Sequence, residues 1–207
     1  MDPVVLSLKS ADLRQSDISL FESGHWLNDA CINFYFEYLS DFATSEHLFM
    51  NPGTSFILLF EDDESDLREA VSELSMDTRQ FLFAAVNDNE QPTYGGSHWS
   101  LLVLARPSRQ IFLYDSLNSQ CNLKNAQKIA GKLGRLYREP YSVTRVPLRH
   151  PQTNSSDCGV YVLLLAELRG GGDAFTLEPL QDRINPESAQ QLRTKCLDVV
   201  TNLRTTS

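Results

Sequence analysis

A thiol stands at the start of a strongly apolar segment, in the stretch SSDCGVYVLLLAEL. Eight of the nine residues from 160 to 168 are apolar, which indicates a buried helix that begins near Cys158 and is too short to cross a membrane. The first turn of a helix carries unpaired N–H groups and a positive partial charge, and both stabilise a thiolate. Cys158 is therefore a candidate nucleophile, although a free cysteine beside apolar residues is more often core filling. Gly159 would leave room for a substrate backbone.

The other three cysteines lack this setting. Cys31 and Cys196 lie in amphipathic helical patterns, and Cys121 lies in a predicted loop. The four cysteines are far apart and form no CxxC pair, which argues against a zinc knuckle and a dense disulfide framework. We expect no metal, no cofactor and no signal peptide. The simplest compartment is then a reducing one, either cytoplasmic or nuclear, or a host cell if the protein is a secreted effector.

A nucleophilic cysteine needs a base, and the base needs a group that orients it. Of the four histidines, His25 and His47 flank predicted helix ends and are expected at the surface. His150 is a candidate by its closeness in sequence to Cys158. His98 is the better candidate, for a geometric reason.

The predicted strands 98–105 and 110–115 flank a four-residue turn, Arg-Pro-Ser-Arg. In the register that this turn sets, Ser100 faces Asp115. His98 then lies two residues along on the same face, where diagonal neighbours are within reach of each other. A slip of one residue would place the two side chains on opposite faces. The alternative is that His98 and Asp115 are strand-end residues in water.

Acyl transfer also needs donors for an oxyanion. The N–H of Cys158, at a helix start, can supply one. Gln152 precedes Cys158 in the stretch HPQTNSSDCG and could supply a side-chain amide, although a loop glutamine alone means little.

The rest of the chain must position these residues. Its 207 residues, 42% hydrophobic and 22% charged, indicate one ordered domain over residues 1–207. The net charge of -9 argues against a nucleic-acid partner and suits a basic peptide tail. No predicted segment reads as a membrane span, and we expect a monomer.

Hydrophobic periodicity and turn residues predict further elements. Strands are expected over Val4–Leu8, Phe81–Val86 and Tyr141–Val146, and a polar loop over Asn87–Ser97. Helices are expected over Trp26–Leu39, Asp62–Leu74, Asn125–Arg138, Cys158–Leu168 (ended by Gly170, Gly171 and Gly172) and Glu187–Leu203. Helices at both ends of a central run of strands indicate an α+β fold.

The motifs HWSLLVL, LYDS and PQTNSSDCGVYV together resemble those of the ubiquitin-like-protein proteases, the Ulp and sentrin-specific cysteine peptidases, which are fold relatives of adenovirus protease. The order His, Asp, Gln, Cys is theirs and reverses the Cys-first order of papain. The resemblance implies a papain-like, adenovirus-protease-like fold with a central mixed sheet flanked by helices. It also implies that His98, Asp115 and Cys158 form the catalytic triad and that Gln152 lines the oxyanion hole.

Three longer stretches, DPVVLSLKSADLRQSDISLF, WLNDACINFYFEYL and NDNEQPTYGGSHWSLLV, resemble the deneddylase branch, of the sentrin-specific protease eight type. That resemblance implies a thiol protease that removes the neddylation modifier from lysines of targets such as cullins, and that processes its precursor after Gly-Gly. It runs from residue 1 to about Ala166 and differs in the loop from Glu90 to Tyr94. No functional residue is carried over from the C-terminal part.

In the family, two tryptophans roof a narrow slot over the modifier's Gly-Gly tail, and Trp26 and Trp99 match them. Asp29 matches a residue that contacts the tail, and in its own right it is a first-turn carboxylate favoured by the helix dipole. Gly95 and Gly96 would let the preceding loop move as the tail enters. The alternative for the two tryptophans is that they are core aromatics.

Other functions stay open beside the deneddylase interpretation. One is a protease of another modifier, sentrin (SUMO) or ubiquitin. Another is an acetyltransferase effector of the same fold type that uses acetyl-coenzyme A, and a third is a non-catalytic modifier-binding domain. Gln152 and the tryptophan pair favour the protease over the acetyltransferase, and a complete triad argues against a pure binder.

Overall fold

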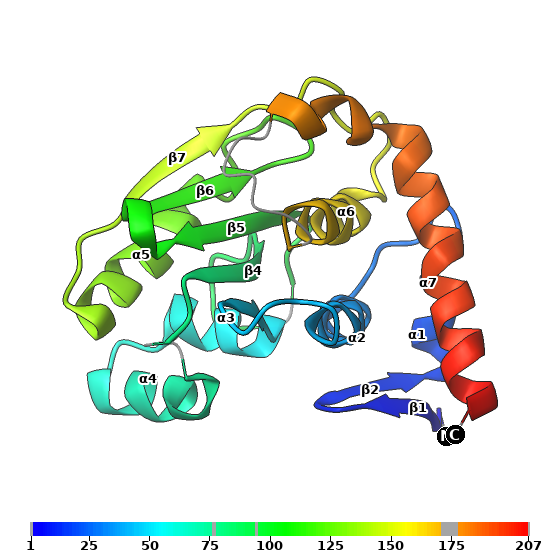
Figure 1. Cartoon of the computed structure of the whole chain (residues 1–207), viewed down its shortest axis with the longest axis horizontal. Coiled ribbons are helices and arrows are strands. Elements are labelled where there is room, and N and C mark those ends of the chain that lie inside the picture. The colour runs from blue at the N-terminus through cyan, green and yellow to red at the C-terminus, as the bar shows by residue number, and fades with distance from the viewer. Residues whose placement is uncertain (1, 76–77, 94, 171–177, 207) are drawn as a thin grey trace.

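A five-stranded mixed sheet runs through the middle of the protein in this computed structural model, which describes residues 2–75, 78–93, 95–170 and 178–206 (Figure 1). Its strands, in spatial order, are β3 (His47–Met50), β4 (Phe81–Asn87), β5 (Trp99–Ala105), β6 (Gln110–Tyr114) and β7 (Ser142–Val146). The central pairs β4–β5 and β5–β6 are antiparallel, and the outer pairs β3–β4 and β6–β7 are parallel.

The β5–β6 hairpin has the register that its turn predicts. Leu101 pairs with Tyr114, and Leu102 pairs with Leu113. The turn is a short 3-10 segment, Arg106–Ser108, closed by Arg109 in the left-handed conformation. The next pair outward in this register would set residue 100 against residue 115, at the end of the hairpin where the candidate site lies.

Helices cover both faces of the sheet and build two hydrophobic cores. The first core holds alternate strand residues such as Phe83 and Val103, packed under α2 (Asp29–Ser40), α6 (Cys158–Gly170) and α7 (Pro186–Thr206). The second core holds the intervening residues, such as Leu102 and Leu113, packed under α3 (Pro52–Phe60) and α5 (Leu123–Tyr137). Figure 1 shows α2 and α6 end-on to the right of the sheet, with α7 along the right-hand edge.

Smaller elements complete the chain. The N-terminal hairpin of β1 (Val4–Leu8) and β2 (Ala11–Arg14) leads into α1 (Gln15–Ser19), and β1 contacts the C-terminal helix α7. The helix α4 (Glu64–Val71) continues into a 3-10 turn at Ser72–Leu74, and another 3-10 segment spans Glu178–Arg183.

Most of the predicted elements are present, and the α+β class is confirmed. The helix predicted from Trp26 begins only at Asp29, because the side chain of Asn28 caps it by accepting the N–H of Cys31 at 2.9 Å. Residues 26–28 therefore lie outside the helix, and all three line the cavity described below. Of the three glycines expected to end α6, Gly170 is its last residue, and Gly171 and Gly172 lie outside the described residues.

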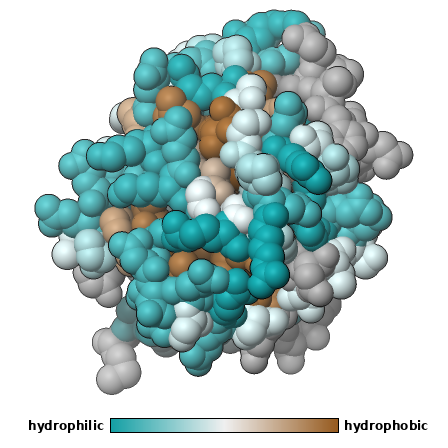
Figure 2. Space-filling view, turned by 90° about the vertical axis from the view of Figure 1, so that its left-hand side faces the viewer, coloured by the Kyte–Doolittle hydropathy of each residue, from teal (hydrophilic) through white to brown (hydrophobic). Residues whose placement is uncertain are grey.

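The surface turned to the viewer in Figure 2 is mostly hydrophilic, with apolar side chains visible mainly in its recesses. This matches the assignment of most large apolar side chains to the two cores. Among the described residues, no helix combines the length and apolar character that a membrane span requires.

Candidate active site

The start of α6 places Cys158 at the first helical position, as expected. The first turn closes where the Tyr161 N–H donates to the carbonyl of Asp157 at 2.9 Å. The side chain of Asn154 stabilises the turn that leads into α6, because its Oδ1 accepts hydrogen bonds from the N–H groups of Ser156 and Asp157, each at 3.0 Å. The Cys158 side chain is buried, so the thiol lies at a helix N-terminus shielded from bulk water.

His98 and Asp115 meet at the ends of β5 and β6. His98 Nε2 lies 2.9 Å from Asp115 Oδ1, and both side chains are buried. Two further donors hold the carboxylate: the Leu117 N–H reaches Oδ1 at 2.9 Å, and the Ser119 hydroxyl reaches Oδ2 at 2.7 Å. Because Nε2 is occupied by Asp115, Nδ1 is the ring nitrogen left for Cys158, with which His98 interacts electrostatically.

Electrostatics at the pair favour a protonated histidine. Burial lowers the pKa of His98, but hydrogen bonds and charge interactions with Asp115 and Cys158 outweigh it and raise the pKa to about 10. Burial acts to raise the pKa of Asp115, yet the donors from His98, Ser119 and Leu117 hold it below its ordinary value. The arrangement therefore favours an imidazolium between a carboxylate and the sulfur of Cys158, which is the charge state of an active cysteine nucleophile.

Gln152 is buried and its amide is fixed at both ends. Its Oε1 accepts the hydroxyl of Ser116 at 2.7 Å, and its Nε2 donates to the carbonyl of Asn154 at 2.6 Å. A backbone carbonyl can only accept, so this contact fixes which end of the amide is nitrogen. The Gln152 N–H also donates to the Ser116 carbonyl at 2.7 Å. One Nε2 proton therefore remains for an oxyanion.

The other histidine and cysteine candidates lie elsewhere. His150 is exposed, and its Nε2 lies 3.4 Å from Asp182. Burial raises the pKa of Cys31 to about 12 and raises the pKa of Cys196 still further, so neither is a reactive thiol. Cys121 is exposed and lies 2.9 Å from the Ser119 hydroxyl. Among the described residues, no group of side chains could hold a metal ion.

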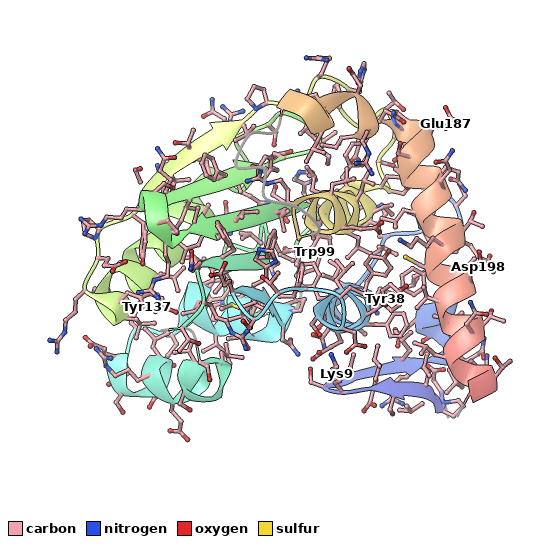
Figure 3. The ribbon with its side chains drawn as sticks, viewed as in Figure 1. Lys9, Tyr38, Trp99, Tyr137, Glu187 and Asp198 are labelled. Atoms are coloured by element: carbon pink, nitrogen blue, oxygen red, sulfur yellow. The ribbon has the colours of Figure 1, made fainter. Side chains whose placement is uncertain are left out.

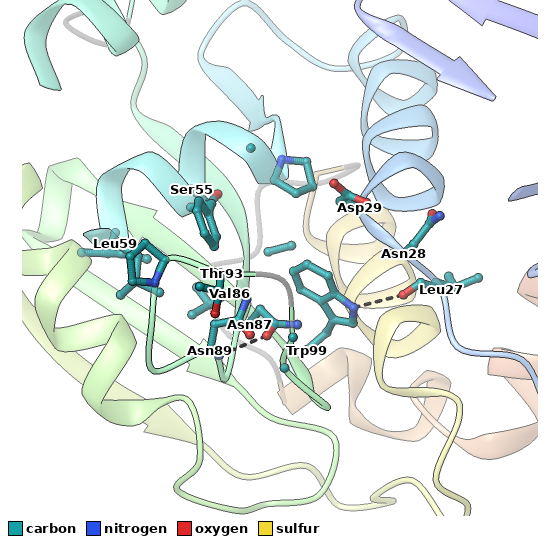
Figure 4. A pocket seen from close by; sticks show the side chains of 18 of the residues that line it. Leu27, Asn28, Asp29, Ser55, Leu59, Val86, Asn87, Asn89, Thr93 and Trp99 are labelled. Carbon is teal, nitrogen blue, oxygen red and sulfur yellow. Dashed lines mark hydrogen bonds between the residues drawn. The ribbon is translucent and has the colours of Figure 1, made fainter. Parts of the chain in front are cut away.

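A cavity of about 790 Å³ brings together all five residues predicted to bind the substrate tail (Figure 4). Its lining includes Trp26, Asp29, Gly95, Gly96 and Trp99, together with residues of α3.

Neither tryptophan is a fully buried core residue. Trp26 is 49% exposed, and the indole of Trp99 donates to the carbonyl of Leu27 at 3.0 Å. Figure 3 shows Trp99 near the centre of the molecule, at the start of β5. The contact ties the indole of Trp99 to the segment that carries Trp26. Asp29 is exposed at the first position of α2, which suits both of its expected roles.

The structure shows why glycine is needed at two positions of the site, which the sequence alone does not reveal. Gly96 has φ +83°, which strains other residues, and a Cβ there would lie 1.6 Å from Oδ1 of Asn87, so a substitution would also displace the Asn87 side chain. Gly159 was expected to admit a substrate backbone. Instead, a Cβ at Gly159 would lie 2.9 Å from Cβ of Leu27, so the close approach is made by the protein's own chain.

Three residues of the site are not predicted from the sequence. Ser116 orients Gln152, Ser119 orients Asp115, and Arg193 of α7 binds the carboxylate of Asp157. Ser116 stands beside Asp115 in the motif LYDS, which is a signal that could have drawn attention to it. Nothing in the pattern around Arg193 distinguishes it from the other charged residues of an amphipathic helix.

Comparison with known proteins gives a consistent result. Residues 25–197 match the Ulp1 protease family, C-terminal catalytic domain. The chain is 37% identical over 173 residues to sentrin-specific protease 8 of Homo sapiens, covering 81% of each protein. It is 27% identical over 186 residues to NEDD8-specific protease 1 of Schizosaccharomyces pombe, covering 85% of this chain and 41% of that protein.

Solved structures show the same fold. The C-terminal Ulp1 protease domain in complex with SMT3, the yeast orthologue of SUMO, superposes with a TM-score of 0.74 at 17% identity, covering 98% of this chain and 89% of that one.

Proposed function

Because the chain belongs to the Ulp1 protease family of cysteine peptidases, we propose that it removes a ubiquitin-like modifier, NEDD8, from lysines of other proteins and processes the modifier's precursor. The observation that carries the proposal is the buried hydrogen bond between Asp115 and His98, whose imidazole interacts with Cys158, beside a cavity lined by Trp26 and Trp99. The chain acts as a single peptidase domain and as a monomer. Its four free cysteines suit the reducing cytoplasm or nucleus.

The first half of the reaction forms a thioester. The thiolate of Cys158 attacks the carbonyl carbon of the modifier's last glycine. The Cys158 N–H and the free Nε2 proton of Gln152 bind the oxyanion that forms. As the tetrahedral intermediate collapses, His98 donates its Nδ1 proton to the lysine amine, which leaves.

The second half releases the modifier. With its proton gone, His98 takes a proton from water, and the hydroxide attacks the thioester carbonyl. The same two donors bind the second oxyanion, and its collapse expels the Cys158 sulfur as a thiolate, with His98 again protonated. Asp115 keeps the imidazole in one orientation through both halves.

The cavity supports a substrate with a glycine tail. Trp26 and Trp99 line this cavity, and we expect them to close over a backbone without side chains, since a narrow slot selects Gly-Gly by steric exclusion. Asp29 stands exposed at the mouth, where it suits a basic tail. NEDD8 as the modifier is supported by the names of the relatives, a sentrin-specific protease 8 and a NEDD8-specific protease.

The deciding experiment measures kcat/KM on a panel of fluorogenic C-terminal derivatives of NEDD8, ubiquitin and SUMO. The proposal expects NEDD8 to be hydrolysed fastest, and Cys158→Ala to abolish hydrolysis while modifier binding remains. A preference for SUMO or ubiquitin would refute NEDD8 as the substrate. Turnover of acetyl-coenzyme A without hydrolysis of any modifier would indicate an acetyltransferase instead. Binding without labelling of Cys158 by a Gly-Gly vinyl sulfone would indicate a non-catalytic binder.

A further inference from the structure

One arginine of the C-terminal helix reaches the segment that carries the nucleophile. The side chain of Arg193 is 1% exposed. Its Nε and Nη2 donate to Oδ1 of Asp157 at 2.9 and 2.7 Å, and Nη2 also donates to the carbonyl of Ser156 at 3.3 Å. Asp157 and Ser156 directly precede Cys158, so the guanidinium is hydrogen-bonded to the chain at the point where α6 begins.

The same guanidinium also donates hydrogen bonds to the segment that precedes Trp26. Its Nη1 donates to the carbonyls of Leu20 and Glu22 at 2.9 and 2.8 Å, and its Nη2 donates to the carbonyl of His25 at 2.7 Å. His25 directly precedes Trp26, which forms one wall of the cavity. Arg193 therefore joins two segments that lie more than 130 residues apart in the sequence.

The two segments touch with little room between them. Gly159 packs so closely on Leu27 that a Cβ would lie 2.9 Å from Cβ of Leu27. The carbonyl of Leu27 in turn accepts the indole N–H of Trp99, the other wall of the cavity, at 3.0 Å. A shift of either segment would therefore change the spacing between the tryptophan walls and Cys158.

Only a guanidinium can make this set of contacts. Arg193 directs donors to both segments from one rigid plane, whereas a lysine offers a single point charge with three donors. Removing the cation also leaves the carboxylate of Asp157 buried without its partner, next to the nucleophile. Neither the lost hydrogen bonds nor the unpaired charge involves a group that contacts the substrate.

We propose that Arg193 is a positioning residue that holds Cys158 at a fixed spacing from the Trp26 wall, so that a bound tail presents its last carbonyl to the sulfur. The inference rests on the proposed function, because it assumes that a glycine tail occupies the cavity. A misplacement of about 1 Å can cost roughly 10²-fold in rate. Loss of the arginine should thus lower kcat by about 10- to 100-fold while KM changes less.

The experiment compares Arg193→Lys, Arg193→Met and Asp157→Asn with a control on the same helix. Lys195→Met is that control, because Lys195 forms an ion pair with Glu167 at 2.7 Å and does not contact the site. Thermal melting first sets a temperature at which every variant is folded. At that temperature kcat and KM are measured with a fluorogenic modifier, and alkylation of Cys158 by iodoacetamide is followed by peptide mass spectrometry.

Iodoacetamide needs the thiol but not the tail cavity, and this separates positioning from general damage. The proposal expects all three site variants to lose kcat, alkylation of Cys158 to stay within about three-fold of wild type, and the control to retain full turnover. If Arg193→Met does not fold, Arg193→Lys and Asp157→Asn decide.

Two results would overturn the positioning role. One is a wild-type kcat in Arg193→Lys and Asp157→Asn. The other is an equal loss of turnover and alkylation, which would mean that Arg193 acts on the thiol itself. A wild-type protein that hydrolyses no modifier would refute the proposed function instead, so the two failures are distinguishable.

Discussion

Replacing Ser116 by alanine should weaken catalysis without touching any group that contacts the substrate. The substitution removes the hydroxyl that donates to Oε1 of Gln152 at 2.7 Å. The amide then keeps its contact with the Asn154 carbonyl, and the Gln152 backbone N–H keeps its contact with the Ser116 carbonyl. Gln152 stays in place, but its side chain gains freedom to rotate away from the oxyanion.

The size of the effect follows from these contacts. A single intramolecular hydrogen bond contributes about 0.5–1.5 kcal/mol. At about 1.4 kcal/mol for each factor of ten, the loss corresponds to roughly 2- to 12-fold in rate. Deleting the donor itself, in Gln152→Ala, should cost about 10²–10³-fold in kcat. Ser116→Ala should therefore lower kcat by about 2- to 12-fold, with KM nearly unchanged.

The assay is steady-state hydrolysis of a fluorogenic modifier by both single variants and the double variant. If Ser116 acts only through Gln152, adding Ser116→Ala to Gln152→Ala should cost nothing further. Ser108→Ala is the matched control, because its hydroxyl donates to the Ala105 carbonyl in the hairpin turn, away from the site. The same loss from Ser116→Ala with and without Gln152 would refute the reasoning, as would a change confined to KM.

Four further predictions concern the triad and the cavity. His98→Ala should lower kcat/KM as severely as loss of the nucleophile, because base and nucleophile act as a unit, while His150→Ala should stay near wild type; the opposite result would disprove the choice of histidine. The protonated form of His98 is lost only as the pH rises through about 10, so the kcat/KM profile should keep its basic limb near that pH. Asp115→Asn should move the limb toward the ordinary value of 6.5 and cost about 10²-fold or more, and an unmoved limb would contradict the role of the carboxylate. Trp99→Ala should lower kcat/KM by more than its loss of melting temperature explains; activity lost only in step with stability would make Trp99 a core residue.

The sequence predicts the parts of the site that are set by local rules. A four-residue turn fixes the register of β5 and β6, and the register alone brings His98 to Asp115. A helix start after a polar loop places Cys158 in the same way. These relations extend over fewer than twenty residues, so short-range patterns are enough to reveal them.

Contacts between distant segments could not be predicted in this way. Arg193 donates hydrogen bonds to carbonyls 168 to 173 residues away, and no sequence pattern around it indicates a buried cation. The strand β3 and the helix α3 are not predicted by the sequence pattern, for another reason. The strand has only four residues, and the helix, PGTSFILLF, has too many apolar residues for a clear amphipathic period.

The placement of the triad on the sheet also bears on when the protein can cut. Strand alternation puts His98 and Asp115 on the face of the second core, whereas Cys158 lies on α6, which packs in the first core. The acid–base pair and the sulfur therefore belong to opposite faces of the same sheet and meet at the strand ends. In a chain whose first or second core is not yet packed, during synthesis or after partial unfolding, His98 and Cys158 are not held together and the peptidase reaction cannot proceed. Proteolysis therefore requires that both faces of the sheet are packed.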